Sequence, residues 1–138
     1  RSICLDYFEQ HLDDFDRKKT MFHFPYNASS PELEEWLLTQ VHALRTGGGG
    51  MNDMPHQQQR KLTCTGYGPG STENHLEAEI EKLLAQPSGW LVYNVHGLDG
   101  EGWGPMRSEF LDGLLGRLKN IESLAILPPG QALASVLD

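Results

Sequence analysis

The sequence predicts an α/β fold built from parallel β/α units. Segments in which apolar residues recur with helical spacing alternate with short apolar, β-prone runs, and this alternation is typical of parallel βαβ units. The segment 90–95 (WLVYNV) is almost wholly apolar, as expected for a strand buried on both faces of a parallel sheet. The 138 residues suit a single domain and are about half of the ~250 that a complete β/α barrel needs. We therefore expect either a small open sheet or a piece of a barrel.

The first part of the chain predicts two helices and two strands. A helix is expected over residues 2–15, because four apolar residues share one helical face: Tyr7, Phe8, Leu12 and Phe15. The β-prone residues 20–24 predict a strand that ends at Pro25. In the dipeptide Ser30-Pro31, an N-cap residue precedes a proline suited to the first helical position, so a second helix begins there. A short strand over 41–45 follows it.

The second part begins with a long irregular segment, residues 46–70, rich in glycine and polar residues. A loop of this length inside a compact domain is often functional, and residues 61–65 predict a brief strand within it. Three helices and two strands are expected beyond the loop: helices over 72–85, 108–118 with Ser108 as N-cap, and 131–137, and strands over 90–95 and 124–127.

Composition excludes several classes of partner. The 11 Lys and Arg against 19 Asp and Glu give a net charge of −8, which argues against nucleic acid or an anionic membrane surface and leaves sugars or cations open. No apolar run approaches the ~20 residues that span a bilayer, and the sequence assigns no cellular compartment. The chain begins at Arg1 rather than Met, so we expect it to be processed, trimmed or excerpted. Cys4 and Cys64 are interpreted as free thiols, with a single disulfide as the alternative.

Functional residues in parallel α/β folds gather at the carboxyl ends of strands. After the strand over 20–24, Pro25 fixes its own φ and would direct the backbone N–H or the hydroxyl of Tyr26 into a site. A backbone N–H placed in this way can stabilise an oxyanion, although a plain strand-ending turn is the alternative. Arg45 ends the next strand and is expected to pair with a carboxylate.

The segment after residue 95 carries the strongest single candidate. His96 follows a predicted buried strand and can act as a general acid or base near pH 7; a structural hydrogen bond to a loop carbonyl is the alternative. Asp99 and Glu101 on the same loop are either metal ligands or solvated acids. Trp103 lies in a glycine-rich loop. It is interpreted as a surface on which a sugar ring stacks, with a side chain that covers the end of a barrel as the alternative. The remaining histidines are interpreted as solvated: His11, His42, His56 and His75.

Three motifs in order, at residues 22–27 (FHFPYN), 43–48 (ALRTGG) and 90–97 (WLVYNVHG), resemble the second half of a polysaccharide deacetylase (NodB homology) domain. The resemblance covers residues from about 5 to 137. It implies that the chain is one domain, the C-terminal part of a larger, distorted β/α barrel. It also implies a metal-dependent hydrolase, a carbohydrate esterase that removes acetyl groups from N-acetylated polysaccharide by attack of a metal-bound water on the acetyl carbonyl.

The resemblance assigns roles to individual residues in the first two motifs. Pro25 and Tyr26 match the family's Arg-x-Pro-Tyr motif, in which the backbone N–H of the tyrosine helps to hold the oxyanion. His23 stands where the family usually has arginine, and Arg45 would take over that orienting role. His96 matches the histidine of a late Leu-x-His motif, the general acid for the leaving amine. The resemblance and the strand-end positions together make five residues candidates for substrate contact: His23, Pro25, Asn94, Asp99 and Trp103, with Asn94 at the position of the motif's leucine.

The family's divalent metal, expected to be zinc, is held by an early Asp-Asp motif and a His-x-x-x-His motif. The second is absent, and Asp13-Asp14 lies in a predicted helix with no strand before it. We therefore expect that this chain lacks the metal ligands, binds no stoichiometric zinc and is inactive alone. The alternative function is a non-catalytic glycan-binding module. An open sheet edge would also allow self-association.

Overall fold

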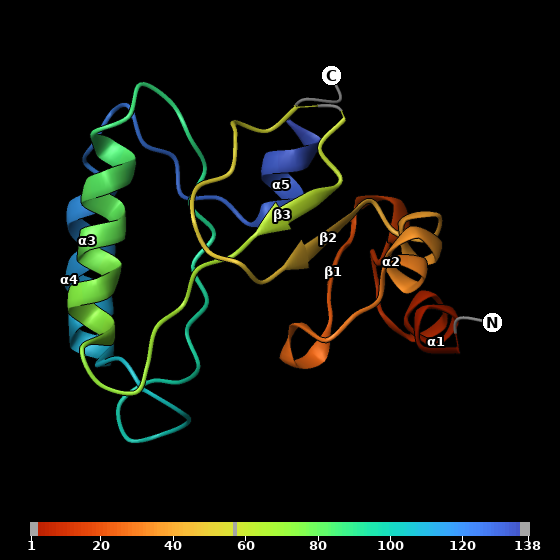
Figure 1. The fold of residues 1–138 in the computed structure, drawn as a ribbon, viewed down its shortest axis with the longest axis horizontal. Helices are drawn as coiled ribbons and strands as arrows, with labels where there is room; N and C mark the ends of the chain where they lie inside the picture. The colour runs from red at the N-terminus through yellow and green to blue at the C-terminus, as the bar shows by residue number, and fades with distance from the viewer. Residues whose placement is uncertain (1–2, 57, 136–138) are drawn as a thin grey trace. The chain divides into compact units, whose positions relative to one another are not determined.

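The computed structural model describes residues 3–56 and 58–135 (Figure 1). The chain consists of two compact units. Unit 1 consists of Arg1–Gly47, Pro55–Leu62 and Pro128–Asp138, and unit 2 consists of Gly48–Met54 and Thr63–Leu127. The described residues form an α/β structure with a three-strand parallel open sheet and five α-helices. The predicted α/β class and parallel pairing are confirmed.

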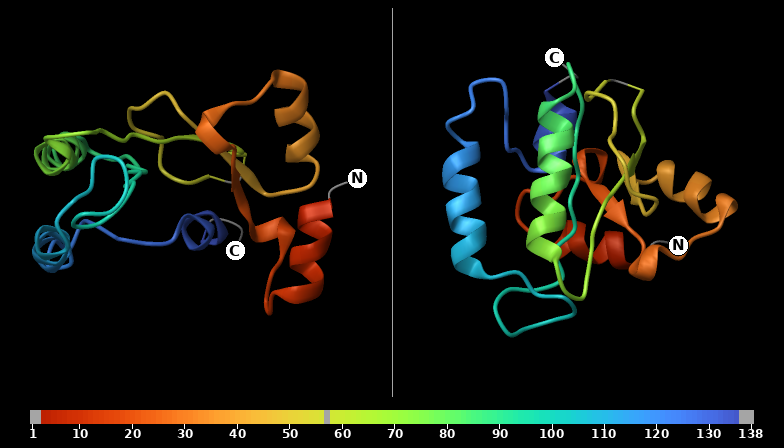
Figure 2. Two further views of the ribbon diagram at one scale, coloured as in Figure 1. Left: turned by 90° about the horizontal axis from the view of Figure 1, so that it is seen from below. Right: turned by 60° about the vertical axis from the view of Figure 1, so that its left-hand side comes forward.

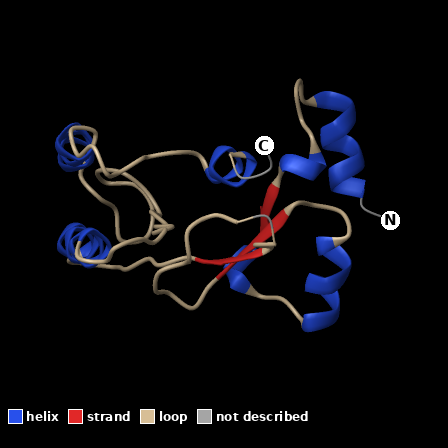
Figure 3. Cartoon of the chain, turned by 90° about the horizontal axis from the view of Figure 1, so that it is seen from above, coloured by secondary structure: helices blue, strands red, loops and turns tan. Residues whose placement is uncertain are grey.

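The sheet has three short strands in the order β1-β2-β3, drawn in red in Figure 3. They are β1 (Met21–His23), β2 (Ala43–Thr46) and β3 (Lys61–Thr63). Strands β1 and β2 pair in parallel with Met21 opposite Ala43 and His23 opposite Arg45. The two carboxyl ends are therefore adjacent, as the parallel arrangement predicts.

Unit 1 places helices beside this sheet. Its helices are α1 (Ile3–His11), α2 (Pro31–Leu38) and α5 (Pro129–Ala134), with 3₁₀ turns η1 (Arg17–Lys19) and η2 (Pro25–Asn27). The N-cap prediction for α2 is confirmed, because Ser30 Oγ accepts the Leu33 N–H at 3.3 Å and Pro31 follows it. The core of this unit is a cluster of apolar side chains from α1, β2 and their neighbours: Leu5, Phe24, Leu37, Val41 and Leu44.

Helix α1 is shorter than the sequence predicts, and it buries a different residue. Leu5 is its buried side chain, whereas Tyr7 and Leu12 from the predicted apolar face are 58% and 52% exposed. The chain then reverses: Asp14 adopts φ 59°, a left-handed conformation that no helix continues through. After the reversal, the Arg17 guanidinium donates to carboxylates on α1, and the basic residues 17–19 form the separate turn η1.

Unit 2 contains two longer helices, α3 (Thr72–Leu84) and α4 (Ser108–Leu118), which lie side by side (Figures 1 and 2). Their bounds agree with the predictions to within one residue. Buried residues from both helices and from the loop before α4 form the core of this unit: Leu76, Ile80, Met106, Leu114 and Leu118.

The expected strand over 90–95 is wrong in part. The segment makes isolated bridges, antiparallel from Trp90 to Asn52 and parallel from Tyr93 to Thr65. Asn52 and Thr65 each form a single bridge to this segment, so no continuous ladder of hydrogen bonds forms. Leu91 and Tyr93 pack against the core of unit 2 and Val92 is buried, whereas Val95 is 36% exposed, so the segment is not buried on both faces as expected.

The end of the chain differs in a similar way. Residues 124–127 form no strand, and Ile126 and Leu127 are 52% and 42% exposed. The terminal helix begins earlier than predicted and is α5. The last residues of its predicted range, 136–137, lie outside the described residues.

Both cysteines are free thiols, as interpreted from the sequence, with Cys4 exposed and Cys64 buried. Within residues 3–56 and 58–135, no helix has the length and apolar character needed to cross a membrane.

Candidate functional site

One group of predicted site residues lies in unit 1, at the carboxyl ends of β1 and β2. His23 and Arg45 are opposite each other in the parallel register, so the sheet brings them to one edge. His23 Nε2 lies 2.9 Å from Asn27 Oδ1. The histidine thus contacts the turn that follows its own strand.

That turn, η2, has an unusual backbone. Tyr26 has φ 56° and ψ 19°, and Asn27 has φ 54°, so two consecutive non-glycine residues are left-handed. Each such residue costs on the order of 1–3 kcal/mol, and strain of this kind is concentrated at functional sites. The Tyr26 side chain is 98% exposed, so burial of its ring does not explain the conformation.

Asn27 was not predicted as a site residue, yet it holds this turn. Its N–H donates to the Phe24 carbonyl at 3.0 Å, and its side chain contacts His23. The same side chain lies against Gly47, where an added Cβ would be 3.0 Å from Nδ2. The only signal in the sequence was the tolerance of asparagine for left-handed backbone.

A second group lies in unit 2 and consists of Asn94, His96 and Trp103. The His96 and Trp103 rings meet edge to face, with centroids 5.2 Å apart and planes at 84°. Asn94 Nδ2 lies 3.2 Å from His96 Nε2. An amide N–H donates here, so Nε2 accepts, and the neutral ring carries its proton on Nδ1. Trp103 is 55% exposed, so part of its ring is open to solvent.

Glycines shape the loop that carries these residues. A Cβ on Gly97 would overlap the Glu101 carbonyl oxygen, and a Cβ on Gly102 would overlap that of His96. Gly102 also has φ +83°, which favours glycine. The loop therefore closes on itself between His96 and Trp103, and only glycine fits at the crossing.

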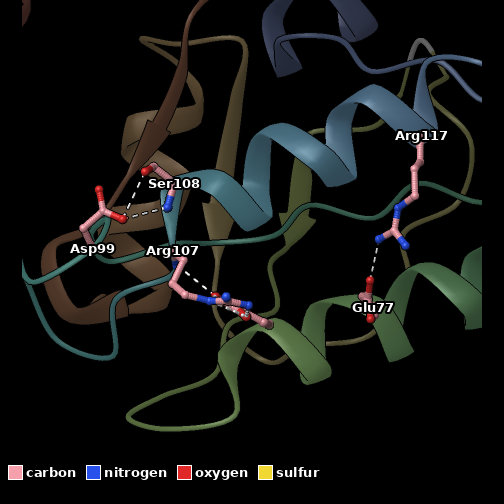
Figure 4. A network of polar contacts seen from close by, with 6 residues as sticks. Glu77, Asp99, Arg107, Ser108 and Arg117 are labelled. Carbon is pink, nitrogen blue, oxygen red and sulfur yellow. Dashed lines mark hydrogen bonds and ion pairs between the residues drawn. The ribbon is translucent and has the colours of Figure 1, made fainter.

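Asp99 anchors the loop to α4 (Figure 4). Its Oδ1 accepts the Ser108 N–H at 2.9 Å and the Ser108 hydroxyl at 3.0 Å. The backbone hydrogen bond is the main reason that the pKa of Asp99 lies below its ordinary value, and the hydroxyl adds to it. The expected N-cap role of Ser108 is wrong: Arg107 is the N-cap residue without a side-chain cap, and Asp99 supplies the carboxylate instead. A role for Asp99 in substrate contact stays a prediction.

Ion pairs join α3 to the start and to the end of α4. Arg107 donates through Nε and Nη2 to Glu73 at 2.9 and 2.7 Å, and its N–H donates to Glu73 Oε1 at 3.0 Å. These hydrogen bonds lower the pKa of Glu73. Arg117 contacts Glu77 (Figure 4).

His75 is not the solvated histidine that the sequence predicted. The Tyr67 ring stacks on it, with centroids 4.7 Å apart and planes at 13°, and its Nδ1 lies 3.0 Å from the Tyr93 hydroxyl. Glu79 Oε1 is 4.0 Å from its Nε2. Burial, with a smaller contribution from the charge of Glu79, raises the pKa of Tyr93. Glu79 lies one turn further along the same helix, but Tyr67 and Tyr93 come from two other segments, which a local pattern cannot show.

Among the described residues, no group of three or more His, Cys, Asp or Glu side chains is arranged to hold a metal ion. The predicted site residues form two groups, one in each unit: His23, Pro25, Tyr26 and Arg45 in unit 1, and Asn94, His96, Asp99 and Trp103 in unit 2. No protein-family model matches this chain, and neither the curated proteins nor the solved structures contain a match.

Proposed function

We propose that this chain is the C-terminal part of a distorted β/α barrel that removes acetyl groups from N-acetylated polysaccharide. The observation that carries the proposal is the pairing of His96 with the exposed Trp103. A histidine beside an open aromatic face combines a proton donor with a surface on which a sugar ring can stack.

The chemistry assigned to unit 2 is proton transfer to the leaving group. Hydrolysis of an N-acetyl group breaks the C–N bond, water supplies the second oxygen of acetate and releases a proton to solvent, and the amine nitrogen takes up a proton. In this step His96 first takes up a proton from solvent at Nε2, then donates it to the amine nitrogen, and is left neutral with its remaining proton on Nδ1. Asn94 then donates its amide N–H to the emptied Nε2, across the 3.2 Å that separates them. General acid catalysis of this kind contributes about 10²–10⁴-fold.

Within unit 1 taken by itself, we propose that the backbone N–H of Tyr26 binds a negatively charged oxygen of a ligand. The left-handed conformation of this residue supports the proposal, because strained backbone persists where function requires it. His23 and Asn27 hold the turn, and Arg45 at the end of β2 orients it.

This reaction class uses a divalent metal, expected to be zinc. The described residues contain no group of three or more His, Cys, Asp or Glu side chains arranged to bind it. Its ligands would come from outside this chain, and the chain alone is expected to be inactive. A specific observation favours the second candidate, a glycan-binding module: Trp103 is exposed and held in place, which suffices for binding without chemistry.

The test is acetate release from an N-acetylated glucosamine oligosaccharide by the native polypeptide that contains this chain, isolated from its source and supplied with zinc. We expect His96→Ala to lower kcat by about 10²–10⁴-fold while glycan binding is retained. His56→Ala, at an exposed histidine in another loop, is the matched control and should have no effect.

Equal loss of activity in both histidine variants would argue against a catalytic role for His96. Glycan binding without any acetate release by the native polypeptide would favour the binding module. Failure of both binding and acetate release would reject the carbohydrate proposal altogether.

A further inference from the structure

Tyr67 presents a second aromatic face in unit 2. Its ring is 47% exposed, although one of its faces is already stacked on His75. His75 is itself fixed, because its Nδ1 contacts the Tyr93 hydroxyl and its Nε2 faces Glu79. One face of the Tyr67 ring is therefore fixed against His75, and the residue remains partly exposed to solvent.

The backbone next to Tyr67 meets the backbone next to Trp103. A Cβ on Gly68 would lie 3.2 Å from the Gly104 Cα and 3.4 Å from Cζ3 of Trp103. Thr72 Oγ1 lies between the two loops, 3.2 Å from the Tyr67 carbonyl oxygen and 3.3 Å from the Gly104 carbonyl oxygen, so that its one O–H can donate to either loop. Gly68, which follows Tyr67, and Gly104, which follows Trp103, thus lie against each other.

The class of ligand follows from the chemistry of these faces. The C–H groups on the apolar side of a pyranose ring carry partial positive charge and meet the negative face of an aromatic ring. Stacked nucleobases would also fit aromatic faces, but they bring phosphates, and this chain has a net charge of −8. An uncharged glycan is the polymer that suits both properties.

We infer that Tyr67 is a second sugar-binding platform. Together with Trp103 it binds an uncharged oligosaccharide that extends beyond the sugar residue stacked on Trp103. This inference rests on the proposed function in placing the reacting sugar at Trp103 and His96. His75 is a positioning residue, because it acts through Tyr67. The length of the glycan, and not only its acetyl group, then sets the affinity.

Calorimetric titration of the 138-residue chain with N-acetylglucosamine oligomers of two and five sugars tests the inference. We expect the pentamer to bind about tenfold more tightly than the dimer, and Tyr67→Ala to remove this advantage while dimer binding is unchanged. Tyr67→Phe keeps the flat ring and should retain wild-type affinity. Tyr7→Ala is the matched control, because Tyr7 is also exposed and lies beside a histidine, with centroids 4.2 Å apart.

Tyr67→Leu serves if the alanine variant does not fold, since it keeps apolar volume without a flat face; it should behave as Tyr67→Ala. Equal affinity for the two oligomers, or equal effects of the Tyr67 and Tyr7 variants, would overturn the second platform. If Trp103→Ala alone weakens binding, this inference fails and the proposed function stands. If the wild-type chain binds neither oligomer, the platform is rejected, whereas the deacetylase proposal is decided separately by acetate release.

Discussion

The Asp99 carboxylate lies at the first turn of α4, where it accepts both hydrogen bonds from Ser108. A negative charge at this end of a helix is favoured by the partial positive charge of the free N–H groups. Asp99 itself has φ 57°, a left-handed conformation that aspartate tolerates better than most residues. One side chain therefore fixes the direction of the His96 loop and the start of a helix.

Asp99→Asn keeps the shape of the side chain and removes its charge. Because the pKa of Asp99 is lowered in the folded state, its contribution to stability is complete above about pH 4, the ordinary pKa of aspartate, and is lost as the pH falls through the lowered value. We expect the variant to have a Tm a few degrees lower at pH 7 and the difference to vanish in strong acid. Thermal unfolding followed by circular dichroism from pH 2 to 7 measures this.

Asp112→Asn on the exposed side of α4 is the control for Asp99→Asn, and its Tm should follow that of the wild type. A difference between wild type and Asp99→Asn that persists at pH 2 would show that the carboxylate charge is not what stabilises the turn.

At the scale of an element, α2 is defined at both ends by side chains. Its start is local, because Ser30 caps the first turn. Its end depends on Arg60, whose guanidinium donates to the carbonyls of Leu38 at 2.6 Å and Val41 at 2.9 Å and also to that of His42. Arg60 therefore connects the last residue of α2 and residues 41–42 beyond it to the segment before β3.

Arg60→Lys should lower the free energy of unfolding by about 1 kcal/mol, because an ammonium group lacks the planar fork that reaches three carbonyls. Urea denaturation measures the change. Arg117→Lys, which alters an exposed pair with Glu77, is the matched control and should change stability by less than about 0.5 kcal/mol. Equal effects of the two substitutions would contradict a special role for Arg60.

Elements with local signals were predictable from the sequence, whereas those that need distant partners were not. Helix α2 follows from the dipeptide Ser30-Pro31, whereas the range of α4 was predicted from Ser108 as its N-cap, a role that Ser108 does not have. The capping of α4 by Asp99 spans nine residues of irregular loop, which no cap rule covers. The segment 90–95 has a strand pattern but lacks neighbours long enough to form a ladder. For the candidate site, His96 and Trp103 were identified by their loop, while the stacking of Tyr67 on His75 was invisible because it joins separate segments.

At the scale of the whole molecule, Asn52 joins segments of unit 2 that are far apart in the sequence. Its side chain is buried, and its Nδ2 donates to the carbonyls of Thr63 at 2.9 Å and Trp90 at 3.2 Å. Its Oδ1 accepts the Thr63 N–H at 2.8 Å. The side chain takes the place of a strand residue between Thr63 and Trp90, just before the same two segments meet directly at Thr65 and Tyr93.

Asn52→Leu has nearly the same volume and removes the side-chain partner of the part-buried Thr63 N–H and carbonyl, while the Trp90 carbonyl keeps the Asn52 backbone N–H. We expect a loss of about 2–3 kcal/mol in the free energy of unfolding, measured by urea denaturation. Asn74→Leu, at an exposed position in α3, is the control and should be nearly neutral. A loss below about 0.5 kcal/mol for Asn52→Leu would show that water replaces the amide at this position.

The loop between His96 and Met106 has a consequence for engineering. Its two ends are fastened, because Asp99 N–H donates to the Met106 carbonyl at 2.7 Å and Met106 N–H donates to the Gly97 carbonyl at 3.1 Å. At its tip, by contrast, a Cβ on Gly100 would meet nothing within 4 Å. Position 100 can therefore be randomised to search for new ligand preferences, while Asp99 on one side of it is kept as the anchor of the loop and the backbone that carries Trp103 keeps its course.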